Sequence, residues 1–206
     1  MTADSFTSQH PSRAVAMVTA QPEHISQLLH WFGSQQEMFS WGGPGMQYPT
    51  NQIQFLRDIG WLKLASIALV PENEIQSAPD SQLLMGFAQI YPRQNCYHFG
   101  RVAISPNDRG KGLGEAFLQK LMQGVIQSQK GETELVAKSE VHPEGFVEPK
   151  SQAIALPFKA DGFSLFVLDD NTPAINCYKK LGFEVSDYPG AMPGGLRNCV
   201  YMVRSV

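Results

Sequence analysis

The feature that most constrains this chain is the stretch VAISPNDRGKGLGEAFLQKL at residues 102–121. A run typical of a β-strand ends in a Pro-Asn-Asp turn, three glycines alternate with other residues, and an amphipathic segment begins. The apolar residues of that segment recur at helical spacing and form one stripe. They are Leu113, Phe117, Leu118, Leu121, Met122 and Val125. The sequence therefore predicts a strand joined to a long helix by a loop of bare backbone.

Two familiar phosphate-binding patterns do not fit this loop. A dinucleotide fingerprint would need glycine where Glu115 stands, and a Walker loop would need Ser or Thr after Lys111. What remains is Arg109-x-x-Gly112-x-Gly114. Backbone N–H groups of such a loop can converge on an anion, and the following helix adds the positive end of its dipole. The loop is expected to bind a pyrophosphate, with a plain surface turn as the alternative.

Strand patterns outnumber helix patterns along the chain. Strands are expected within residues 14–20, 61–70, 83–92, 96–105, 163–170, 184–188 and 199–204. Helices are expected from Pro22 to Phe32, at 35–39, after a Thr50 cap, along 113–125, and at 172–183 with Gly182 closing the end. Because three strands precede the glycine loop, the sequence predicts an α/β fold of the α+β type. Its sheet would be mixed, mostly antiparallel and flanked by helices.

The composition is that of one globular domain covering residues 1–206, since domains usually hold about 100–200 residues. The 16 basic and 19 acidic residues give a formal charge of −3, which argues against a general nucleic-acid binder. Residues 131–162 contain Pro143, Pro149 and Pro157 and show no clear periodicity. This segment is expected to be an insertion or a long excursion.

The sequence indicates no metal site, disulfide framework or membrane span. Cys96, Cys177 and Cys199 form no C-x-x-C pair and are odd in number. The amino terminus lacks the basic and apolar regions of a signal peptide. No apolar run approaches the roughly 18 residues of a membrane helix. We therefore expect a protein of the reducing cytoplasm that uses no metal and does not bind a membrane.

A second stretch, LFVLDDNTPAINCYKKLGFEV at residues 165–185, makes the pattern specific. With the glycine loop, it resembles the GNAT superfamily of acyl-CoA-dependent N-acetyltransferases. The positions that match are Arg109, Gly112, Gly114, Asn171, Ala174, Tyr178, Leu181, Gly182 and Phe183. The resemblance covers residues 97–129 and 163–185 and implies a GNAT-like fold with splayed central strands.

The resemblance also implies a site for acetyl-CoA. In such a site the strand backbone pairs with the pantetheine arm, the glycine loop holds the pyrophosphate, and Asn171 contacts or orients the arm. The implied cofactor-binding residues are Val102, Ala103, Ile104, Arg109, Gly110, Lys111, Gly112, Leu113, Gly114 and Asn171. For Asn171, or for Thr172 beside it, simple capping of the helix is the alternative.

Tyr178 is the implied catalytic residue, with its hydroxyl directed at the thioester sulfur. An amine that attacks a thioester must be neutral, and a thiolate must leave. The thioester carbonyl must also be polarised, and backbone N–H groups would do this. With reference pKa values of about 8.5 for a thiol and 10 for Tyr, full proton transfer from Tyr178 is uphill by roughly 2 kcal/mol in water. A preorganised hydrogen bond to the sulfur is the expected role, and a packing tyrosine is the alternative.

No general base is assigned from the sequence. Tyr91, His98 and Asp170 lie near strand ends, where a base or a water chain leading to one could operate. His98 has a suitable reference pKa of about 6.5. A single His in a strand also fits a structural role.

The acceptor side is less defined. Trp41 and Tyr48 stand on the glycine-rich loop at 38–49, where GNAT proteins bind their acceptor, and they either line an amine pocket or pack onto the core. His142, Glu144 and Glu148 either attract a cationic acceptor or form a solvated acidic loop.

The sequence thus predicts an N-acetyltransferase that moves acetyl from acetyl-CoA to a primary amine of a small molecule or peptide by direct attack. Two other interpretations stay open. One is a non-catalytic acyl-CoA-binding sensor or regulatory module, and the other is nucleotide binding by the same loop. Because edge strands of this superfamily often pair, a homodimer is a further expectation.

Overall fold

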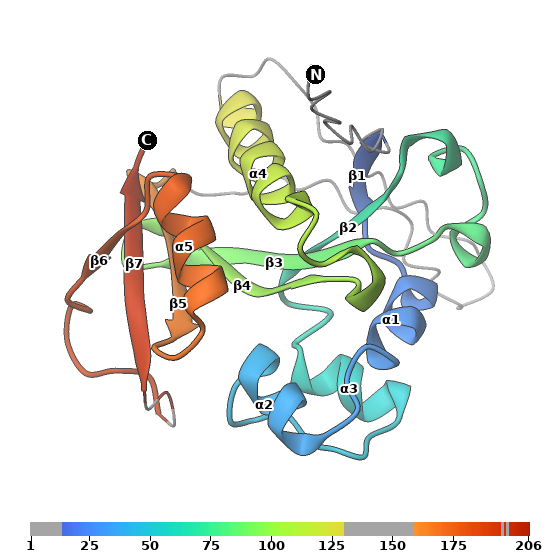
Figure 1. Cartoon of the computed structure of the whole chain (residues 1–206), viewed down its shortest axis with the longest axis horizontal. Helices are drawn as coiled ribbons and strands as arrows, with labels where there is room; N and C mark the ends of the chain where they lie inside the picture. Colours follow the sequence, from blue (N-terminus) through green and yellow to red (C-terminus); the bar gives the residue numbers. More distant parts are fainter. Residues whose placement is uncertain (1–13, 130–158, 195, 197) are drawn as a thin grey trace, which may run out of the picture.

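In the computed structural model, seven strands form one sheet with helices on both faces (Figure 1). The structure describes residues 14–129, 159–194, 196 and 198–206. The strands are β1 (Val15–Thr19), β2 (Ala65–Pro71), β3 (Gly86–Arg93), β4 (Cys96–Ile104), β5 (Gly162–Leu168), β6 (Glu184–Ser186) and β7 (Cys199–Ser205). The α-helices are α1 (Pro22–Leu29), α2 (Gln35–Gly42), α3 (Gln52–Asp58), α4 (Leu113–Gln129) and α5 (Thr172–Lys180).

The strands lie in the order β1-β2-β3-β4-β5-β7-β6. Neighbours are antiparallel except β4 and β5, which are parallel. A parallel pair needs a crossover connection, and the long helix α4 lies within it. The predicted mixed, mostly antiparallel sheet is therefore confirmed. Residues 131–158 of the expected insertion, including His142, Glu144 and Glu148, lie outside the described part of the chain.

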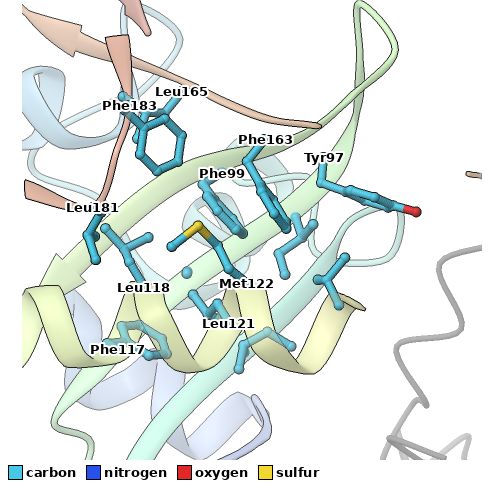
Figure 2. Close-up of a cluster of buried hydrophobic side chains, with 14 of the residues drawn as sticks. Tyr97, Phe99, Phe117, Leu118, Leu121, Met122, Phe163, Leu165, Leu181 and Phe183 are labelled. Atoms are coloured by element: carbon cyan, nitrogen blue, oxygen red, sulfur yellow. The ribbon is translucent and has the colours of Figure 1, made fainter. Parts of the chain in front are cut away.

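One face of the sheet is covered by α4. The helix buries Phe117, Leu118, Leu121, Met122 and Val125, which is the stripe that its periodicity predicts; Leu113 is only partly buried. In Figure 2 this stripe meets aromatic and aliphatic side chains of β4, β5 and the end of α5. Complete burial of one such side chain contributes about 1.5–3 kcal/mol, so this core fixes α4, and the loop before it, against β4 and β5.

The opposite face is covered by the three amino-terminal helices, drawn below the sheet in Figure 1. Ile25 and Leu28 of α1, Met38 of α2 and Phe55 of α3 are fully buried there. They pack against residues of β2, β3 and β4, including Phe87. This packing places α2 next to β4, where α2 forms part of the site.

Some predicted boundaries were wrong by a few residues. The cap of α3 is Asn51 rather than Thr50, because the Asn51 Oδ1 accepts a hydrogen bond from the Gln54 N–H at 2.9 Å. The second strand begins at Ala65 rather than Trp61, since the chain first turns at Gly60, which has φ +64°. Gly182, with φ +82°, follows α5 as expected and makes the left-handed turn that ends a helix.

Candidate functional site

The two central strands pair along only part of their length. β4 and β5 are hydrogen-bonded neighbours from the pair Cys96–Gly162 to the pair Phe99–Leu165. Beyond these residues β4 runs on to Ile104 against β3, and β5 runs on beside β7. The two strands therefore separate at this end, and each has a free backbone edge facing the gap.

A β-bulge accompanies the separation. The register between β3 and β4 shifts between the pairs Phe87–Ala103 and Gln89–Gly100, and Arg101 lies at the bulge with φ +52°. The Arg101 guanidinium donates to the Gln89 side-chain oxygen at 2.7 Å and to the Asp58 carbonyl at 3.2 Å. A bulge bends its strand, so this arrangement fixes the direction in which β4 leaves β5.

A cleft of about 1000 Å³ opens at the separation, between β4, the glycine loop, α2 and α5. The sequence-predicted residues that line it are Trp41, Tyr91, His98, Val102, Ala103, Ile104, Arg109, Gly110, Gly112, Leu113, Gly114, Asn171 and Tyr178. Tyr48, Lys111 and Asp170 do not line it. The structure therefore brings together segments about sixty residues apart that the sequence predicts to form one site.

The glycine loop presents bare backbone to this cleft. Gly110 and Gly112 have φ of +75° and +78°, and a Cβ on either would meet no atom within 4 Å. Within the described chain, the N–H groups from Arg109 to Gly114 donate no hydrogen bond of ordinary geometry. They lie at the N-terminus of the 17-residue helix α4. Unpaired donors at the positive end of a helix dipole fit a phosphate or pyrophosphate group.

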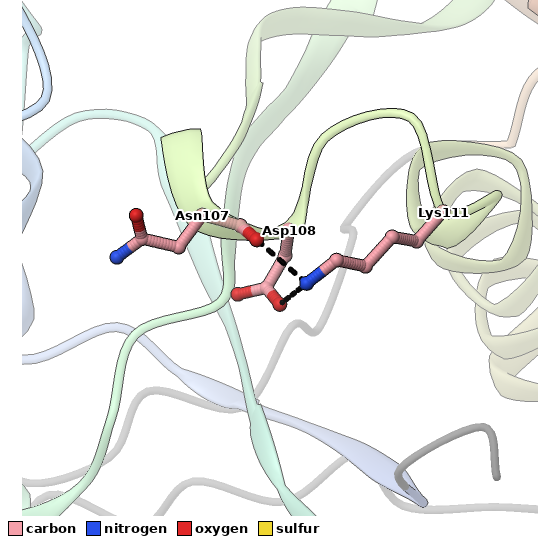
Figure 3. A network of polar contacts seen from close by, with 3 residues as sticks. All are labelled: Asn107, Asp108 and Lys111. Carbon is pink, nitrogen blue, oxygen red and sulfur yellow. Dashed lines mark hydrogen bonds and ion pairs between the residues drawn. The ribbon is translucent and has the colours of Figure 1, made fainter. Parts of the chain in front are cut away.

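The two basic side chains of the loop have different partners. Arg109 donates from Nε to the Ile104 carbonyl oxygen at 3.1 Å, which ties the loop to the end of β4. Figure 3 shows the Lys111 ammonium folded back onto the preceding turn, where it contacts the Asn107 carbonyl at 2.6 Å and the Asp108 carboxylate at 3.2 Å. Lys111 is highly exposed, so it stabilises the turn only weakly.

Asn171 lies at the start of α5 and on the wall of the cleft. Its Oδ1 accepts a hydrogen bond from the Ala174 N–H at 3.2 Å, so it caps the helix. The capping alternative is therefore present in the structure. It uses the side-chain oxygen, and the amide NH₂ group is still available to donate.

Tyr178 lies on the inner face of α5, partly buried, with its ring edge-on to Phe183 at 6.2 Å between centroids. Burial, with a smaller effect of Cys177, raises the pKa of Tyr178 above its ordinary value. The hydroxyl therefore stays protonated at neutral pH and can donate a hydrogen bond into the cleft.

A model of the acetyltransferase (GNAT) domain matches residues 72–185, which is more than half of the chain. The protein belongs to the GNAT acetyltransferases. The matched residues run from the segment before β3 through the glycine loop and α5 to β6. They include β4, the glycine loop and α5, whereas α2 lies outside the matched residues.

Solved structures show the same fold for nearly the whole GNAT chain. A ribosomal-protein-alanine N-acetyltransferase from Escherichia coli is 15% identical with a TM-score of 0.52, and the match covers 93% of each chain. The PaiA N-acetyltransferase from Thermoplasma acidophilum, solved with coenzyme A, is 14% identical with a TM-score of 0.52, covering 94% and 99%. The spermidine N-acetyltransferase from Vibrio cholerae, solved with CoA and spermine, is 10% identical with a TM-score of 0.57, covering 93% and 95%.

The two aromatic residues proposed for the acceptor pocket of this GNAT protein differ in position. Trp41 lines the cleft, but it also stacks on Phe32 and Phe55 at 4.7 and 5.6 Å between centroids and belongs to the core. Tyr48 is 38% exposed and lies away from the cleft lining. Of this pair only Trp41 lines the cleft, and it lies on helix α2 rather than on a loop.

The three candidate general bases lie in different environments. His98 is 2% exposed, and its Nδ1 lies 2.9 Å from the Ser164 hydroxyl oxygen. Burial, with the nearby charge of Arg93, lowers the pKa of His98 to about 3. An imidazole with so low a pKa is a weak proton acceptor, so His98 is a poor general base in this state. Tyr91 lines the cleft, and Asp170 does not.

Sequence reasoning missed a cationic and aromatic cluster at the end of the cleft near β5. The Arg93 guanidinium lies over the rings of Tyr91 and Phe166, at 5.5 and 5.2 Å from their centroids. Tyr188 and Tyr201 contact Phe166 in turn at 5.3 and 5.2 Å. The available signal was the spacing of Tyr91 and Arg93, which places both on one face of a strand.

Among the described residues, no three potential metal-ligating side chains gather, and no helix has the length and hydropathy to cross a bilayer. The features that distinguish the cleft are therefore bare backbone donors, aromatic rings and one guanidinium over them.

Proposed function

We propose that this GNAT protein transfers the acetyl group of acetyl-CoA to a primary amine by direct attack of the amine on the thioester. The observation that carries the proposal is the run of N–H groups from Arg109 to Gly114, which have no acceptor among the described residues and lie where β4 and β5 separate. A loop of this kind fits a pyrophosphate, and the free strand edge beside it fits an extended arm with amide groups.

Each part of the cofactor has a place in this arrangement. The N–H groups of the loop would donate to the pyrophosphate, and the open space over Gly110 and Gly112 lets the backbone approach it. The edge of β4 from Val102 to Ile104 has no β5 neighbour, so it can pair with the amides of the pantetheine arm. Asn171, on the other wall, would donate its NH₂ group to the arm.

The cofactor supplies an acetyl group activated as a thioester. In the transfer a bond forms between the amine nitrogen and the acetyl carbon, the carbon–sulfur bond breaks, and the proton lost by nitrogen balances the thiolate that leaves. Tyr178 would donate a hydrogen bond to the sulfur as negative charge develops there. Because burial raises the Tyr178 pKa, complete proton transfer is harder than in water, and hydrogen-bond donation is the role that fits.

The names of two similar proteins indicate two different amine acceptors for those proteins. One of them acts on spermidine and another on a ribosomal-protein alanine. Their identity to this chain is 10% and 15%, which supports the fold alone.

The test is turnover with a broad panel of amines. Purified protein is incubated with acetyl-CoA and polyamines, amino acids, amino sugars or peptides with a free N-terminus or lysine. Thiol release and the mass of the product are measured together. We expect one class of amine to gain an acetyl group with one thiol released per product. Binding of CoA without any acetylated amine would identify a non-catalytic sensor, and tighter binding of ATP or NAD than of CoA would identify a nucleotide-binding protein.

A further inference from the structure

Arg93 holds a positive charge inside the cleft that no described residue neutralises. Its guanidinium rests on the rings of Tyr91 and Phe166 and lines the cavity. Within the described part of the chain it forms no hydrogen bond and no ion pair. A guanidinium has five N–H donors in a planar fork, so this one keeps its full capacity for an anion.

The position of this charge relates it to the reacting end of the cofactor. Phe166 is the first residue of β5 after the last residue paired with β4, which is Leu165. Arg93 itself pairs with Cys96, at the other end of the segment where β4 and β5 are paired. Its side chain brings the guanidinium to 5.2 Å from the ring of Phe166, the residue just after that pairing ends. Its charge also contributes to the lowered pKa of His98, so its field reaches the buried end of the cleft.

The acidic side chains of the cleft do not complement a cationic acceptor at this point. Three carboxylates line the cavity, from Glu37, Asp108 and Glu115. Glu37 accepts from the Gly33 N–H at 2.6 Å, and Asp108 pairs with Lys111. Glu115 lies in the first turn of α4, after the glycine loop. The groups that contact Arg93 itself are aromatic, so a polyamine would meet its charge there without a counter-ion.

We propose that Arg93 binds a carboxylate of the acceptor, and that the substrate is therefore an amine carrying a carboxylate, that is, a molecule of the amino-acid class. This inference rests on the proposed acetyl transfer. An Arg–carboxylate pair is bidentate and charge-assisted, and it is strongest where rings exclude water from one side. The rings of Tyr91 and Phe166 provide that side, and they leave the amine free to point toward the gap between the strands.

The test compares each amino acid with its amide, which keeps the amine and side chain but removes the carboxylate charge. Steady-state kinetics are measured for the wild type and for Arg93→Gln, Arg93→Lys and Arg57→Gln. Arg57 is exposed on α3 and does not line the cleft, so the last variant controls for net charge. We expect the wild type to prefer amino acids over amides at least tenfold in kcat/KM. In Arg93→Gln we expect kcat/KM for the amino acids to fall roughly 10–100-fold, mainly through a higher KM, and kcat/KM for the amides to stay unchanged. The preference for amino acids would then disappear.

Arg93→Lys should recover part of the preference, because it keeps the charge and loses the fork. Arg57→Gln should behave as the wild type. Equal use of amino acids and amides by the wild type, a preference for spermidine, or an equal loss on both substrates in Arg93→Gln would overturn the proposal.

A second measurement does not need turnover. In the presence of CoA, calorimetry compares N-acetylated amino acids with N-acetylated amino-acid amides as product ligands. The wild type should bind the carboxylate form more tightly, and Arg93→Gln should bind the two alike. If this pattern appears without turnover, acetyl transfer fails and the carboxylate site stands. If amines without a carboxylate are acetylated and both product forms bind alike, the transfer stands and the Arg93 proposal fails.

Discussion

The indole Nε1 of Trp41 donates a hydrogen bond to the carbonyl oxygen of Arg101, 2.9 Å away. This contact links α2 to the bulge of β4, at the residue whose φ of +52° marks the bend. Below it, the Arg101 side chain is held by Gln89 and by carbonyls at the end of α3. Trp41 therefore supports the wall of the cleft as well as lining it.

Removing that hydrogen bond should cost stability. Trp41→Phe keeps an aromatic ring but leaves the Arg101 carbonyl without its donor, and we expect the free energy of unfolding to fall by about 1–3 kcal/mol. Urea denaturation measures this change. Trp61→Phe is the matched control, since the Trp61 side chain has no hydrogen bond to a described residue. A loss no greater in Trp41→Phe than in Trp61→Phe would mean that the bond contributes nothing to the bulge.

Asn171 combines a cap with a place on the cleft wall, and two variants separate the roles. Asn171→Ala and Asn51→Ala each remove a side-chain oxygen that caps a helix, so each should lower the free energy of unfolding by about 1 kcal/mol. Only Asn171→Ala should also weaken acetyl-CoA kinetics, because Asn51 lies outside the cleft. Melting temperatures and kinetic constants are measured for both. Normal kinetics with a lower melting temperature in Asn171→Ala would leave Asn171 as a cap alone.

Tyr178→Phe should lower kcat far more than it weakens acetyl-CoA binding. The change removes one hydroxyl and keeps the ring contact with Phe183, so stability should change little. The lost hydrogen bond matters mainly when charge develops on sulfur, which is typical of transition-state stabilisation. A positioned acid typically raises the reaction rate about 10²–10⁴-fold. The loss in Tyr178→Phe is expected to be only part of this range if a water molecule replaces the missing hydroxyl. A kcat within about threefold of wild type, well short of that range, would make Tyr178 a packing residue.

Local patterns predicted most of the fold and the segments that line one side of the cleft. The spacing of apolar residues defined α4, and the glycines defined a loop whose φ values of +75° and +78° at Gly110 and Gly112 need residues without a Cβ. The bulge could not be predicted, because a left-handed conformation at Arg101 comes from tertiary contacts and leaves no signal in the residue type.

The cluster around Arg93 was also beyond prediction. Arg93 and Phe166 come together only when β3, β4 and β5 assemble, since they lie on strands far apart in the chain. Tyr48 lies outside the cleft lining, and the turn-rich sequence around it does not indicate which of its aromatics faces the cleft. Asn51 and Thr50 are both good cap residues, and the hydrogen bond to Gln54 decides between them.

The central claim is that the glycine loop binds CoA, and calorimetry of CoA with Gly112→Val and Gly190→Val tests it most directly. Both glycines have positive φ, of +78° and +96°, and both have open space where a Cβ would stand. Each variant therefore has similar backbone strain, of about 1–2 kcal/mol, but only Gly112 lines the cleft. We predict that both fold, as circular dichroism will report, and that Gly112→Val alone loses at least tenfold in CoA affinity. Unchanged CoA affinity in a folded Gly112→Val protein, or an equal loss in both variants, would contradict the assignment.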